Sequence, residues 1–429
     1  MGGKVDFMSK KILVVGGGGR EHAVIRSLKL NKNIEKIYCA PGNGGISKDA
    51  VCVDIKATDI DAMVDLAKQE GIDFVVVTPD DPLVLGMVDA FEKVSIPTFG
   101  PDKAAAIIEG SKVFSKNLMK KYNIPTAKYE VFEKAEAAIE YIKSQNTYPT
   151  VIKADGLALG KGVVLAQDEA EAIDAVNSIM SDKIFGDSGN NIVVEEFLTG
   201  MEVSILTFTD GKTLAPMISS MDHKRALDGD KGLNTGGMGT IAPNPFYSEE
   251  IQQKCMQEIF VPTINAMKEE NRTFKGCLYF GLILTDEGPK VIEYNCRFGD
   301  PETQVVLPLL RTDLFDIMQA VYNETLQNIK IEWEDKTVAC VVLASGGYPK
   351  AYDTGIEISG LDDNGQADGV TVFHAGTKFK DGFLTSGGRV MGVTAVADDL
   401  ESALRQSYSA VQGIKFDGAH YRTDIGKKC

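Results

Sequence analysis

The densest group of chemically capable side chains lies in and after one apolar run, Val291-Ile-Glu-Tyr-Asn-Cys-Arg-Phe-Gly-Asp-Pro-Glu302. If this run is a strand, its two-residue period places Glu293 and Asn295 on the same face. Mg²⁺ in proteins takes one or two side-chain oxygens and completes its octahedron with water and nucleotide phosphates. Arg297 follows two residues later, where its guanidinium could hold an acyl or phosphoryl oxygen through two hydrogen bonds. The segment therefore favours a metal and phosphate site over an exposed sheet face.

A glycine-rich loop, Asp155–Gly162, follows a second apolar strand that carries Lys153. The loop is not the P-loop of nucleoside triphosphatases, because only three residues separate Gly156 from Gly160 and Gly162 replaces the Ser or Thr that holds magnesium. A lysine within an apolar strand either extends to solvent or binds an anion. The glycine-rich loop directly after it favours a phosphate ligand.

The run Gly16–Arg20 lies between a predicted strand and a predicted helix, where backbone amides and a helix N-terminus can hold an anion. A dinucleotide site needs G-x-G-x-x-G and an acidic residue at the end of the next strand. Here Glu21 breaks the glycine pattern and the next strand ends at Ala40-Pro41, so a nicotinamide site is disfavoured. A tight turn and a phosphate cradle both remain open, and Arg20 favours the phosphate.

Three further segments give weaker signals. Val193–Glu202 predicts a strand that runs into a turn, either an edge strand with solvated carboxylates or a hinge that meets adenine and its ribose. Asp222–Arg225 and Leu233–Gly239 are expected to be loops, and the glycines of the latter allow close approach of a ligand to the backbone. The histidines have no spacing typical of metal ligands, and no G-x-S-x-G motif supports a serine nucleophile.

The elements that position these residues alternate between strands and helices from the start. Lys11–Val15, Lys36–Ala40 and Phe74–Thr78 are expected strands, and Glu21–Leu30 and Ile60–Glu70 are expected helices. This alternation predicts βαβ units and a parallel sheet up to about residue 110. Further strands are expected at Val151–Lys153, Val163–Ala166, Ile192–Phe197, Val203–Phe208, Leu278–Leu284, Lys290–Asn295, Val338–Ala344, Val370–His374 and Arg389–Ala397, and further helices at Lys112–Tyr122, Glu169–Met180, Glu249–Glu270 and Asp399–Gln412.

Composition limits the class of protein. The 429 residues include 45 Lys and Arg against 61 Asp and Glu, a net charge of −16, which argues against a nucleic-acid binder with a basic face. No apolar run approaches the roughly 20 residues that span a bilayer, so we expect no membrane partner. Seven scattered cysteines without a C-x-x-C pair predict reduced thiols. Since Met1–Lys10 also lacks the apolar core of a secretory leader, we expect a cytoplasmic protein.

Taken in order, these segments resemble the ATP-grasp ligases, and more closely the phosphoribosylamine–glycine ligase family of purine biosynthesis. The resemblance extends over residues 10–427. Its most specific motifs are Asn234-Thr-Gly-Gly-Met-Gly239 and Asn295-Cys-Arg-Phe-Gly-Asp-Pro-Glu-Thr303. It also rests on Gly18–Ala23, Ala40–Asn43, Lys153–Leu157, Gly160–Val163 and Asp222–Arg225.

The resemblance implies an ATP-dependent ligase that joins glycine to 5-phosphoribosylamine. ATP would phosphorylate the carboxylate of glycine, and the amine would then attack the glycyl phosphate to give glycinamide ribonucleotide, ADP and phosphate. The expected co-substrate is ATP with Mg²⁺ or Mn²⁺, and the expected partners are these small molecules. Such catalysis relies on positioning and charge neutralisation, so no covalent nucleophile is needed.

The resemblance also assigns roles to single residues. Lys112 and Lys153 would bind the ATP phosphates under a loop that includes Gly160, Lys161 and Gly162. The other assigned residues are Glu195, Glu196, Phe197 and Leu198 around the adenine, Glu202 on the ribose, Glu293 and Asn295 on the metal, Arg297, Asp222 and Lys224 with Lys153 at the glycyl phosphate, Gly18, Gly19, Arg20 and Asn43 at the sugar phosphate, and Asn234, Gly237 and Asp300 as further substrate ligands.

The implied fold is α/β in three parts. They are an N-terminal parallel-sheet domain like that of biotin carboxylase (10–110), a central ATP-grasp domain (111–333) with a mobile subdomain at about 125–200, and a C-terminal β-rich α+β domain (334–429). Other ATP-grasp enzymes have a further carboxylate on the strand before the metal pair, but Leu278–Leu284 has none. Either fewer protein ligands hold the metal, or another acid reaches the site. We expect a monomer or a small homo-oligomer.

Two functions other than this ligation remain open on the sequence. One is an ATP-grasp carboxylase that acts on a ribonucleotide and consumes bicarbonate. The other is a nucleotide sensor that binds ATP without releasing phosphate. Phosphate release that depends on glycine and 5-phosphoribosylamine together distinguishes the ligase from both.

Overall fold

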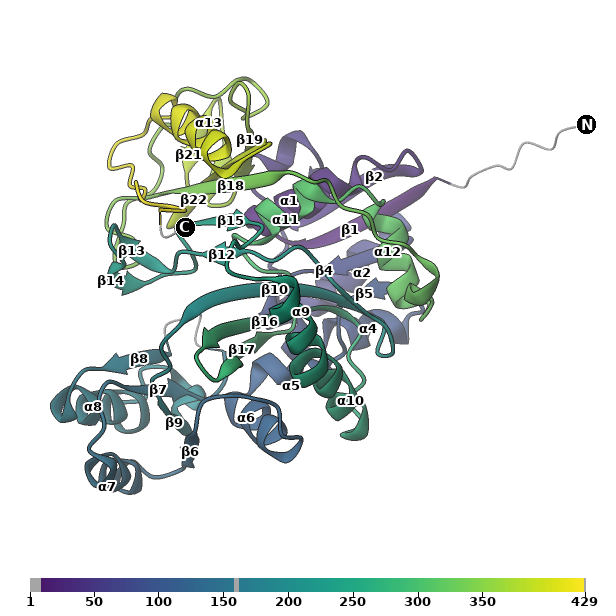
Figure 1. Ribbon diagram of the computed structural model, residues 1–429. Helices are drawn as coiled ribbons and strands as arrows, with labels where there is room; N and C mark the ends of the chain where they lie inside the picture. The colour runs from purple at the N-terminus through teal and green to yellow at the C-terminus, as the bar shows by residue number, and fades with distance from the viewer. Residues whose placement is uncertain (1–8, 158–161, 428–429) are drawn as a thin grey trace, which may run out of the picture.

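The computed structural model describes residues 9–157 and 162–427. Its N-terminal part is a sheet in the order β3-β2-β1-β4-β5, in which all pairings are parallel (Figure 1). The strands of this sheet, in chain order, are β1 Lys10–Gly16, β2 Ile34–Pro41, β3 Val51–Cys52, β4 Phe74–Val77 and β5 Thr98–Phe99, and the helices are α1 Gly19–Leu28, α2 Ile60–Glu70, α3 Asp80–Leu85 and α4 Met87–Lys93. Residues 12–15 of β1 are fully buried, as expected for a parallel sheet covered on both faces.

An antiparallel lobe follows, joined to the N-terminal part through α5 (Lys103–Gly110) and α6 (Lys112–Lys121). Its sheet has the order β6-β9-β7-β8, and it projects from the rest of the molecule in Figure 1. The elements of this lobe are β6 Tyr129–Phe132, α7 Ala135–Gln145, β7 Thr150–Ala154, β8 Val163–Ala166, α8 Glu169–Val176 and β9 Ile192–Glu196. The lobe packs a small core of its own between the sheet and the two helices.

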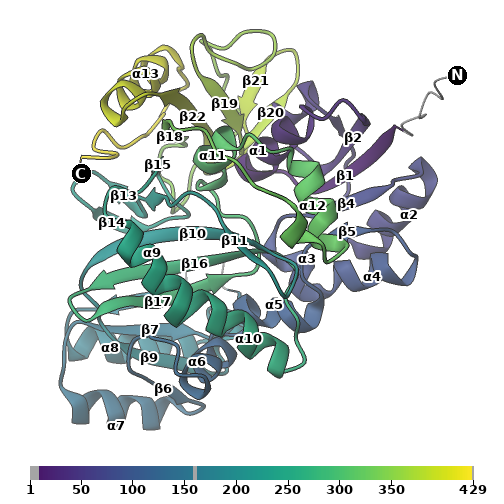
Figure 2. The ribbon, with the colours of Figure 1, turned by 45° about the vertical axis from the view of Figure 1, so that its right-hand side comes forward.

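A second antiparallel sheet, in the order β11-β10-β16-β17, forms the centre of the molecule. Its strands are β10 Met201–Thr209, β11 Leu214–Pro216, β16 Gly276–Thr285 and β17 Gly288–Asn295. Helices α9 (Glu249–Cys255) and α10 (Val261–Glu269) cross one face of this sheet (Figure 2). A π-helical turn at Met256–Phe260 joins them, so the helix expected at Glu249–Glu270 is nearly continuous.

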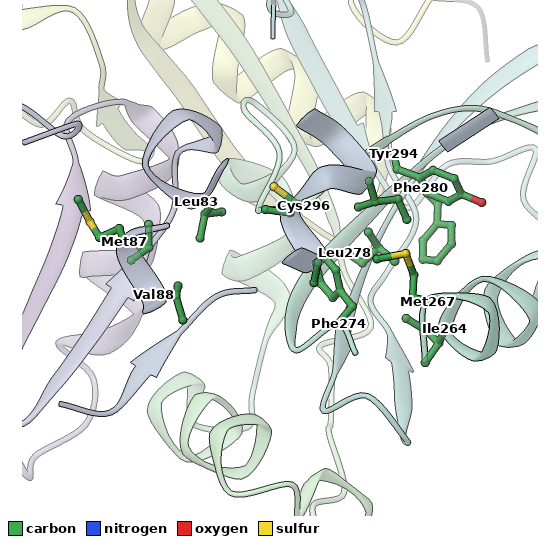
Figure 3. Close-up of a cluster of buried hydrophobic side chains, with 14 of the residues drawn as sticks. Leu83, Met87, Val88, Ile264, Met267, Phe274, Leu278, Phe280, Tyr294 and Cys296 are labelled. Atoms are coloured by element: carbon green, nitrogen blue, oxygen red, sulfur yellow. The ribbon is translucent and has the colours of Figure 1, made fainter. Parts of the chain in front are cut away.

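One hydrophobic cluster joins the N-terminal part to this central sheet. Figure 3 shows Leu83 of α3 and Met87 of α4 on one side, with Leu278 of β16 and Met267 of α10 on the other. All of these side chains are buried in a single cluster. The central sheet is therefore fixed against the N-terminal part by apolar packing.

The C-terminal sheet, in the order β12-β15-β18-β22-β19, combines strands from two parts of the chain. Strands β12 (Met221–Asp222) and β15 (Gly239–Ala242) come from the central segment, whereas β18 (Thr337–Ala344), β19 (Thr371–His374) and β22 (Arg389–Ala397) come from the end. Helix α13 (Leu400–Gly413) packs on β18 and β22. The remaining elements are the hairpins β13 Arg225–Leu227 with β14 Lys231–Asn234 and β20 Thr377–Phe379 with β21 Phe383–Thr385, and the helices α11 Thr303–Val306 and α12 Leu314–Tyr322.

The expected fold class is confirmed, and each strand and helix expected from periodicity is found with small shifts at its ends. The expectation of loops at 222–225 and 233–239 holds for residues 223–224 and 235–238, but the ends of both segments belong to the short strands β12 to β15. Strands of two to four residues with charged and glycine positions show no usable period, and pairing with a partner strand is what forms them. Among the described residues, no helix has the length and apolar character needed to cross a membrane.

Candidate active site

A cavity of about 510 Å³ lies between the antiparallel lobe and the central sheet. It collects most of the residues that the sequence singled out. Those that line it are Lys112, Lys153, Gly162, Glu195, Glu196, Phe197, Leu198, Glu202, Asp222, Lys224, Asn234, Glu293, Asn295, Arg297 and Asp300. The described lining does not include Gly18, Gly19, Arg20, Asn43 or Gly237, and Gly160 and Lys161 fall outside the described residues.

Strand β17 places Glu293 and Asn295 in the lining of this cavity. Gly281 on the neighbouring strand β16 pairs with Glu293, and a Cβ at Gly281 would come within 3.0 Å of Cγ of Glu293. A glycine opposite the carboxylate therefore leaves it room. Oδ1 of Asn295 accepts a hydrogen bond from Nη2 of Arg297 at 3.1 Å, and its second lone pair stays available to another partner.

Four cations surround the Glu293 carboxylate. Burial alone would raise the pKa of Glu293, but these charges hold it at about 2. The cations, in decreasing order of effect, are Lys224, Lys153, Lys112 and Arg297. The nearest of these cations is Lys224, whose Nζ lies 3.5 Å from Oε1 of Glu293. Glu293 is therefore ionised at neutral pH within a cationic site suited to phosphate oxygens.

The glycine-rich loop is tied to the start of α6. The carboxylate of Asp155 accepts hydrogen bonds from the hydroxyl of Ser111 at 3.0 Å and the backbone N–H of Val113 at 3.2 Å. Nζ of Lys112 donates to the carbonyl oxygen of Gly156 at 2.9 Å. Burial lowers the pKa of Lys112. These contacts fix Lys112 at the base of the loop.

A buried carboxylate, Glu195, lies between two lysines. Its Oε2 is 3.1 Å from Nζ of Lys153 and 3.1 Å from Nζ of Lys116, whereas Oε1 is buried and has no hydrogen-bond partner among the described residues. Lys153 also donates to the carbonyl oxygen of Ile292 at 3.1 Å. Burial lowers the pKa of Lys116 to about 8. The free oxygen is available to a ligand group that carries a donor.

Lys116 was not anticipated from the sequence. The signal was present, because a lysine four residues after Lys112 lies on the same face of the expected helix. Lys120 and Lys121 follow it, so nothing local distinguishes the lysine that faces the cavity. Only the packing of α6 on β9 shows which one is buried.

The segment after β9 leads into β10 along the cavity. Oε1 of Glu196 accepts a hydrogen bond from the backbone N–H of Lys128 at 2.9 Å. Phe197 is 42% exposed, so a large apolar ring borders the cavity with little protein packed over it. Oε2 of Glu202 lies 3.6 Å from Nζ of Lys224. This segment offers an apolar surface followed by a carboxylate, as a nucleoside requires.

Two unpartnered polar atoms mark another part of the cavity. Oδ1 of Asp222 and Nε of Arg297 are buried and have no hydrogen-bond partner in the parts of the chain that the structure describes. Nη2 of Arg297 forms an ion pair of 3.1 Å with Glu109. Burial and the nearby Glu302 raise the pKa of Asp222. A donor and an acceptor are thus both available to a small ligand with two charged ends.

Glu109 and Glu302 are cavity residues that the sequence did not mark as buried acids facing the ligand. Oε2 of Glu109 accepts the backbone N–H of Cys296 at 2.7 Å, which fixes the end of β17. Oε1 of Glu302 accepts a hydrogen bond from the hydroxyl of Ser204 at 3.2 Å. Glu302 belongs to the Asn295–Thr303 motif, whereas Glu109 belongs to no motif, and long-range packing brings it to the site.

The turn at Gly16–Arg20 holds an anion, but that anion belongs to the chain itself. The backbone N–H of Gly18 donates to Oε2 of Glu21 at 2.5 Å, and Nε of Arg20 donates to Oε1 at 2.6 Å. Glu21 also accepts the hydroxyl of Thr78 at 2.7 Å. The turn borders the cavity through Asp300, since a Cβ on Gly18 would come within 3.3 Å of Oδ2 of Asp300.

The side chain of Asn43 is engaged with the backbone. Its Nδ2 donates to the carbonyl oxygens of Gly17 at 2.9 Å and His374 at 2.8 Å, and its Oδ1 accepts from the N–H groups of Gly45 and Ile46. Asn43 therefore links the Gly16–Arg20 turn to the C-terminal part of the chain.

The donors available for a metal ion are few. Within residues 9–157 and 162–427, no three His, Cys, Asp or Glu side chains are grouped as a metal centre. The oxygens of Glu293 and Asn295 suit a hard cation that takes most of its ligands from phosphate and water. Of the two possibilities left by the sequence, this arrangement favours the one with few protein ligands.

Comparison with known proteins gives matches along nearly the whole chain. Three family models match: the phosphoribosylglycinamide synthetase N domain at residues 10–109, its ATP-grasp (A) domain at 110–303 and its C domain at 338–428. A phosphoribosylamine–glycine ligase of Caldanaerobacter subterraneus subsp. tengcongensis is 48% identical over 416 residues, which are 97% of this chain and 99% of that protein. The trifunctional purine biosynthetic protein adenosine-3 of Gallus gallus is 46% identical over 98% of this chain and 42% of that longer protein.

Solved structures agree with these matches. The phosphoribosylamine–glycine ligase of Thermotoga maritima superposes with a TM-score of 0.84 and 32% identity, covering 97% of this chain and 100% of that one. A biotin carboxylase of Campylobacter jejuni, solved as a beta-gamma-ATP complex, reaches a TM-score of 0.74 at 15% identity, over 97% of this chain and 94% of that one. At that identity the second likeness concerns the fold alone.

Proposed function

The chain belongs to the phosphoribosylglycinamide synthetase family, and we propose that its cavity aligns ATP, glycine and 5-phosphoribosylamine for ligation. It is an ATP-dependent ligase of purine biosynthesis that forms a C–N bond. Family membership over the whole chain decides against the carboxylase and the nucleotide sensor left open by the sequence. The observation that carries the site proposal is the Glu293 carboxylate among four cations, beside Asn295 and Arg297.

We place the adenosine of ATP along the segment Glu195–Glu202. The unpartnered Oε1 of Glu195 can accept a hydrogen bond from the exocyclic amine of adenine, while its Oε2 is paired with Lys116 and Lys153. Phe197 and Leu198 supply apolar contact with the base, and the carboxylate of Glu202 can accept from ribose hydroxyls. This end of the cavity therefore favours a base that carries a hydrogen-bond donor on its edge, as adenine does.

The phosphates of ATP then extend toward Lys112, Lys153 and the glycine-rich loop. Lys112, held at Gly156, and Lys153, held at Ile292, present ammonium groups into the cavity. Glu293 and Asn295 would hold Mg²⁺ or Mn²⁺, which neutralises charge on the transferring phosphoryl group when bound. Lysines and carboxylate fixed in advance lower the reorganisation needed during phosphoryl transfer.

We place glycine between Arg297 and Asp222. The guanidinium can hold the carboxylate of glycine, and the unpartnered Oδ1 of Asp222 can hold its ammonium group. A carboxylate oxygen attacks the γ-phosphorus, and ADP leaves, which gives glycyl phosphate. The neutral amine of 5-phosphoribosylamine then attacks the acyl carbon, phosphate leaves, and the nitrogen loses a proton to give glycinamide ribonucleotide. Lys224 stabilises the charge that develops on the acyl phosphate.

We place 5-phosphoribosylamine where Asp300 meets the Gly18–Arg20 turn. Gly19 lets Gln304 pack closely against this turn, since a Cβ there would come within 2.5 Å of the Gln304 amide. The N–H of Gly18 already donates to Glu21. The sugar phosphate would therefore be bound by the backbone amides that follow Gly18 and by the Arg20 guanidinium. Asn43 supports the turn from behind through Gly17.

Phosphate release with one component omitted at a time tests the proposed function. We expect release that requires ATP, a divalent cation, glycine and 5-phosphoribosylamine together, with glycinamide ribonucleotide as the product. Release that depends on bicarbonate instead of glycine would contradict it. Titration with Mg²⁺ and Mn²⁺ in the same assay determines which cation supports turnover.

We further propose a cytoplasmic protein that works as a monomer or a small homo-oligomer. The six described cysteines are free thiols, which suits a reducing compartment. Light scattering coupled to size-exclusion chromatography measures the mass directly. A mass well above a tetramer would contradict the proposed assembly.

A further inference from the structure

Arg389, at the start of β22, joins two segments that line the cavity although it is not among the described lining residues itself. Its Nη1 donates to the carbonyl oxygens of Gly236 at 2.6 Å and Asp300 at 2.7 Å, with a longer contact of 3.4 Å to Gly237. Its Nη2 lies 3.6 Å from Oδ2 of Asp300. One guanidinium thus connects the Gly236–Gly237 loop to the turn at Asp300.

The Gly236–Gly237 loop forms the wall beside the acyl end of the cavity. Gly237 has a φ of +115°, and a Cβ there would come within 2.5 Å of Oδ1 of Asp222, the unpartnered carboxylate oxygen. The N–H of Gly236 donates to the hydroxyl of Tyr348 at 3.2 Å. A shift of this loop would therefore change the space around Asp222 directly.

The turn at Asp300 lies next to this loop, since a Cβ on Gly237 would also come within 2.4 Å of Cδ of Pro301, and it extends toward the Gly18–Arg20 turn. Oδ1 of Asp300 accepts a hydrogen bond from the amide of Gln304 at 2.7 Å. Oδ2 of Asp300 faces Gly18, where a Cβ would come within 3.3 Å. The two segments held by Arg389 are thus the ones that border glycine on one side and the amine substrate on the other.

Arg389 is itself held firmly. Its carbonyl oxygen accepts the N–H of Gly376 at 2.9 Å, and the next residues of β22, Val390 and Met391, are fully buried. Only 21% of the Arg389 side chain is exposed, so its hydrogen bonds form largely out of water and are strong. A Cβ on Gly236 would come within 2.8 Å of Cζ of Arg389, so the guanidinium packs flat against the loop.

We propose that Arg389 is a positioning residue of the ligation: it aligns the acyl-phosphate wall of the cavity with the wall that receives the amine. The identity of these two substrates rests on the proposed function. Lys112 and Lys153 are held by other contacts, to Gly156 and Ile292. Loss of Arg389 therefore affects amine transfer more than ATP binding.

Steady-state kinetics of the full-length Arg389→Met variant test this role. Because misplacement by about 1 Å can cost about 100-fold in rate, we expect kcat to fall about 10- to 100-fold. On the same ground we expect the KM for 5-phosphoribosylamine to rise about tenfold and the KM for ATP to stay within about twofold. Arg389→Lys should recover part of the loss, since an ammonium group can still donate to one of the two segments. Arg405→Met is the matched control, because Arg405 is an exposed arginine on α13 that contacts Ser402 of its own helix.

Hydrogen–deuterium exchange supplies a readout that needs no substrate. We expect faster exchange of peptides that cover 234–239 and 298–304 in Arg389→Met, and no change in Arg405→Met. Unchanged exchange, an equal rise in both KM values, or a loss of activity that merely tracks a lower melting temperature would overturn the proposal. If the wild-type protein showed no dependence on glycine and 5-phosphoribosylamine, the proposed function would fail, while the exchange experiment would still decide whether Arg389 holds the two segments.

Discussion

Two regions of this protein bury charged side chains, and they do so in opposite ways. In the cavity, Glu195, Asp222 and Arg297 each have a buried polar atom without a hydrogen-bond partner among the described residues. Behind the β13–β14 hairpin, by contrast, Arg422 is fully buried, and each of its three nitrogens donates to a partner. Its Nε and Nη2 bind Asp424 at 2.7 and 2.9 Å, and its Nη1 binds Asp230 at 3.0 Å.

The difference separates a ligand site from a structural one. A buried polar atom without a partner costs roughly 1–3 kcal/mol, so three of them in the lining of one cavity favour a ligand that binds them. The Arg422 cluster has its partners within the chain and ties the C-terminal segment to the β13–β14 hairpin, which ends at Asn234. Substitutions in the cavity should therefore change turnover more than stability, and those at Arg422 should do the reverse.

The largest effect is expected from Glu293→Ala. Without Glu293, the neutral side chain of Asn295 is the one proposed protein ligand left for the metal. We expect turnover to fall by about 1,000-fold or more. The fold should persist, because Glu293 borders the cavity and does not belong to a core cluster. Phosphate release at saturating metal and circular dichroism measure the two quantities. Near-normal turnover would remove Glu293 from the metal site.

The next largest effect is expected from Lys153→Ala. Loss of a phosphate-facing ammonium group, which also pairs with Glu195, should raise the KM for ATP and lower kcat/KM about 100-fold. Lys143→Ala serves as the control, since Lys143 is exposed on α7. Kinetics at varied ATP measure the change. An unchanged KM and kcat would show that Lys153 is not part of the ATP site.

Arg422→Met probes the other region. It leaves the Asp424 and Asp230 carboxylates without their cation, and the free energy of unfolding should fall by about 2 kcal/mol, less than for a fully buried pair because both carboxylates are partly solvated. The KM for ATP, measured well below the melting temperature, should stay close to wild type. A large kinetic defect with normal stability would contradict the structural role.

The smallest effect is expected from acidification, which should lower the free energy of unfolding through the contact between α1 and β19. Nδ1 of His22 accepts the N–H of His374 at 2.8 Å, and Nε2 of His22 is 3.0 Å from Asp49. Burial lowers the pKa of His374 to about 4. Burial also lowers the pKa of His22; the charge of Arg26 adds to this lowering, and Asp49 opposes it. The unfolded chain therefore takes up protons, near pH 6.5, that the folded chain excludes.

Stability at this contact should be full above pH 6.5 and should decline as the pH falls toward 4. We expect a loss of about 1 kcal/mol or more between pH 6.5 and 5.5, measured by urea unfolding at each pH. His374→Gln should reduce the slope, because it removes one of the two titrating groups. A stability that rose on acidification in this range would contradict the role assigned to these histidines.

The parts of this structure that local pattern can encode were predictable from the sequence. The two-residue period of β17 placed Glu293 and Asn295 together, and both line the cavity. The apolar run at Phe74–Val77 and the amphipathic pattern at Ile60–Glu70 gave their elements at or within one residue of their observed ends. Each of these follows from side chains that are close in sequence.

What could not be predicted depends on contacts between distant segments. Glu109 of α5 reaches the end of β17, and Arg389 reaches the cavity loops from β22. In both cases the local sequence allowed several partners, and tertiary packing selected one.

The composite C-terminal sheet limits how this chain can be divided. Residues Gly239–Ala242 of β15 pair with Val338–Val341 of β18, so the sheet is complete only when central and terminal segments are both present. A cut between residues 332 and 336 would expose an unpaired edge on each fragment, one of them along the apolar strand Thr337–Ala344. Recombination between homologous enzymes should therefore exchange residues 221–242 together with the C-terminal segment as one inherited block.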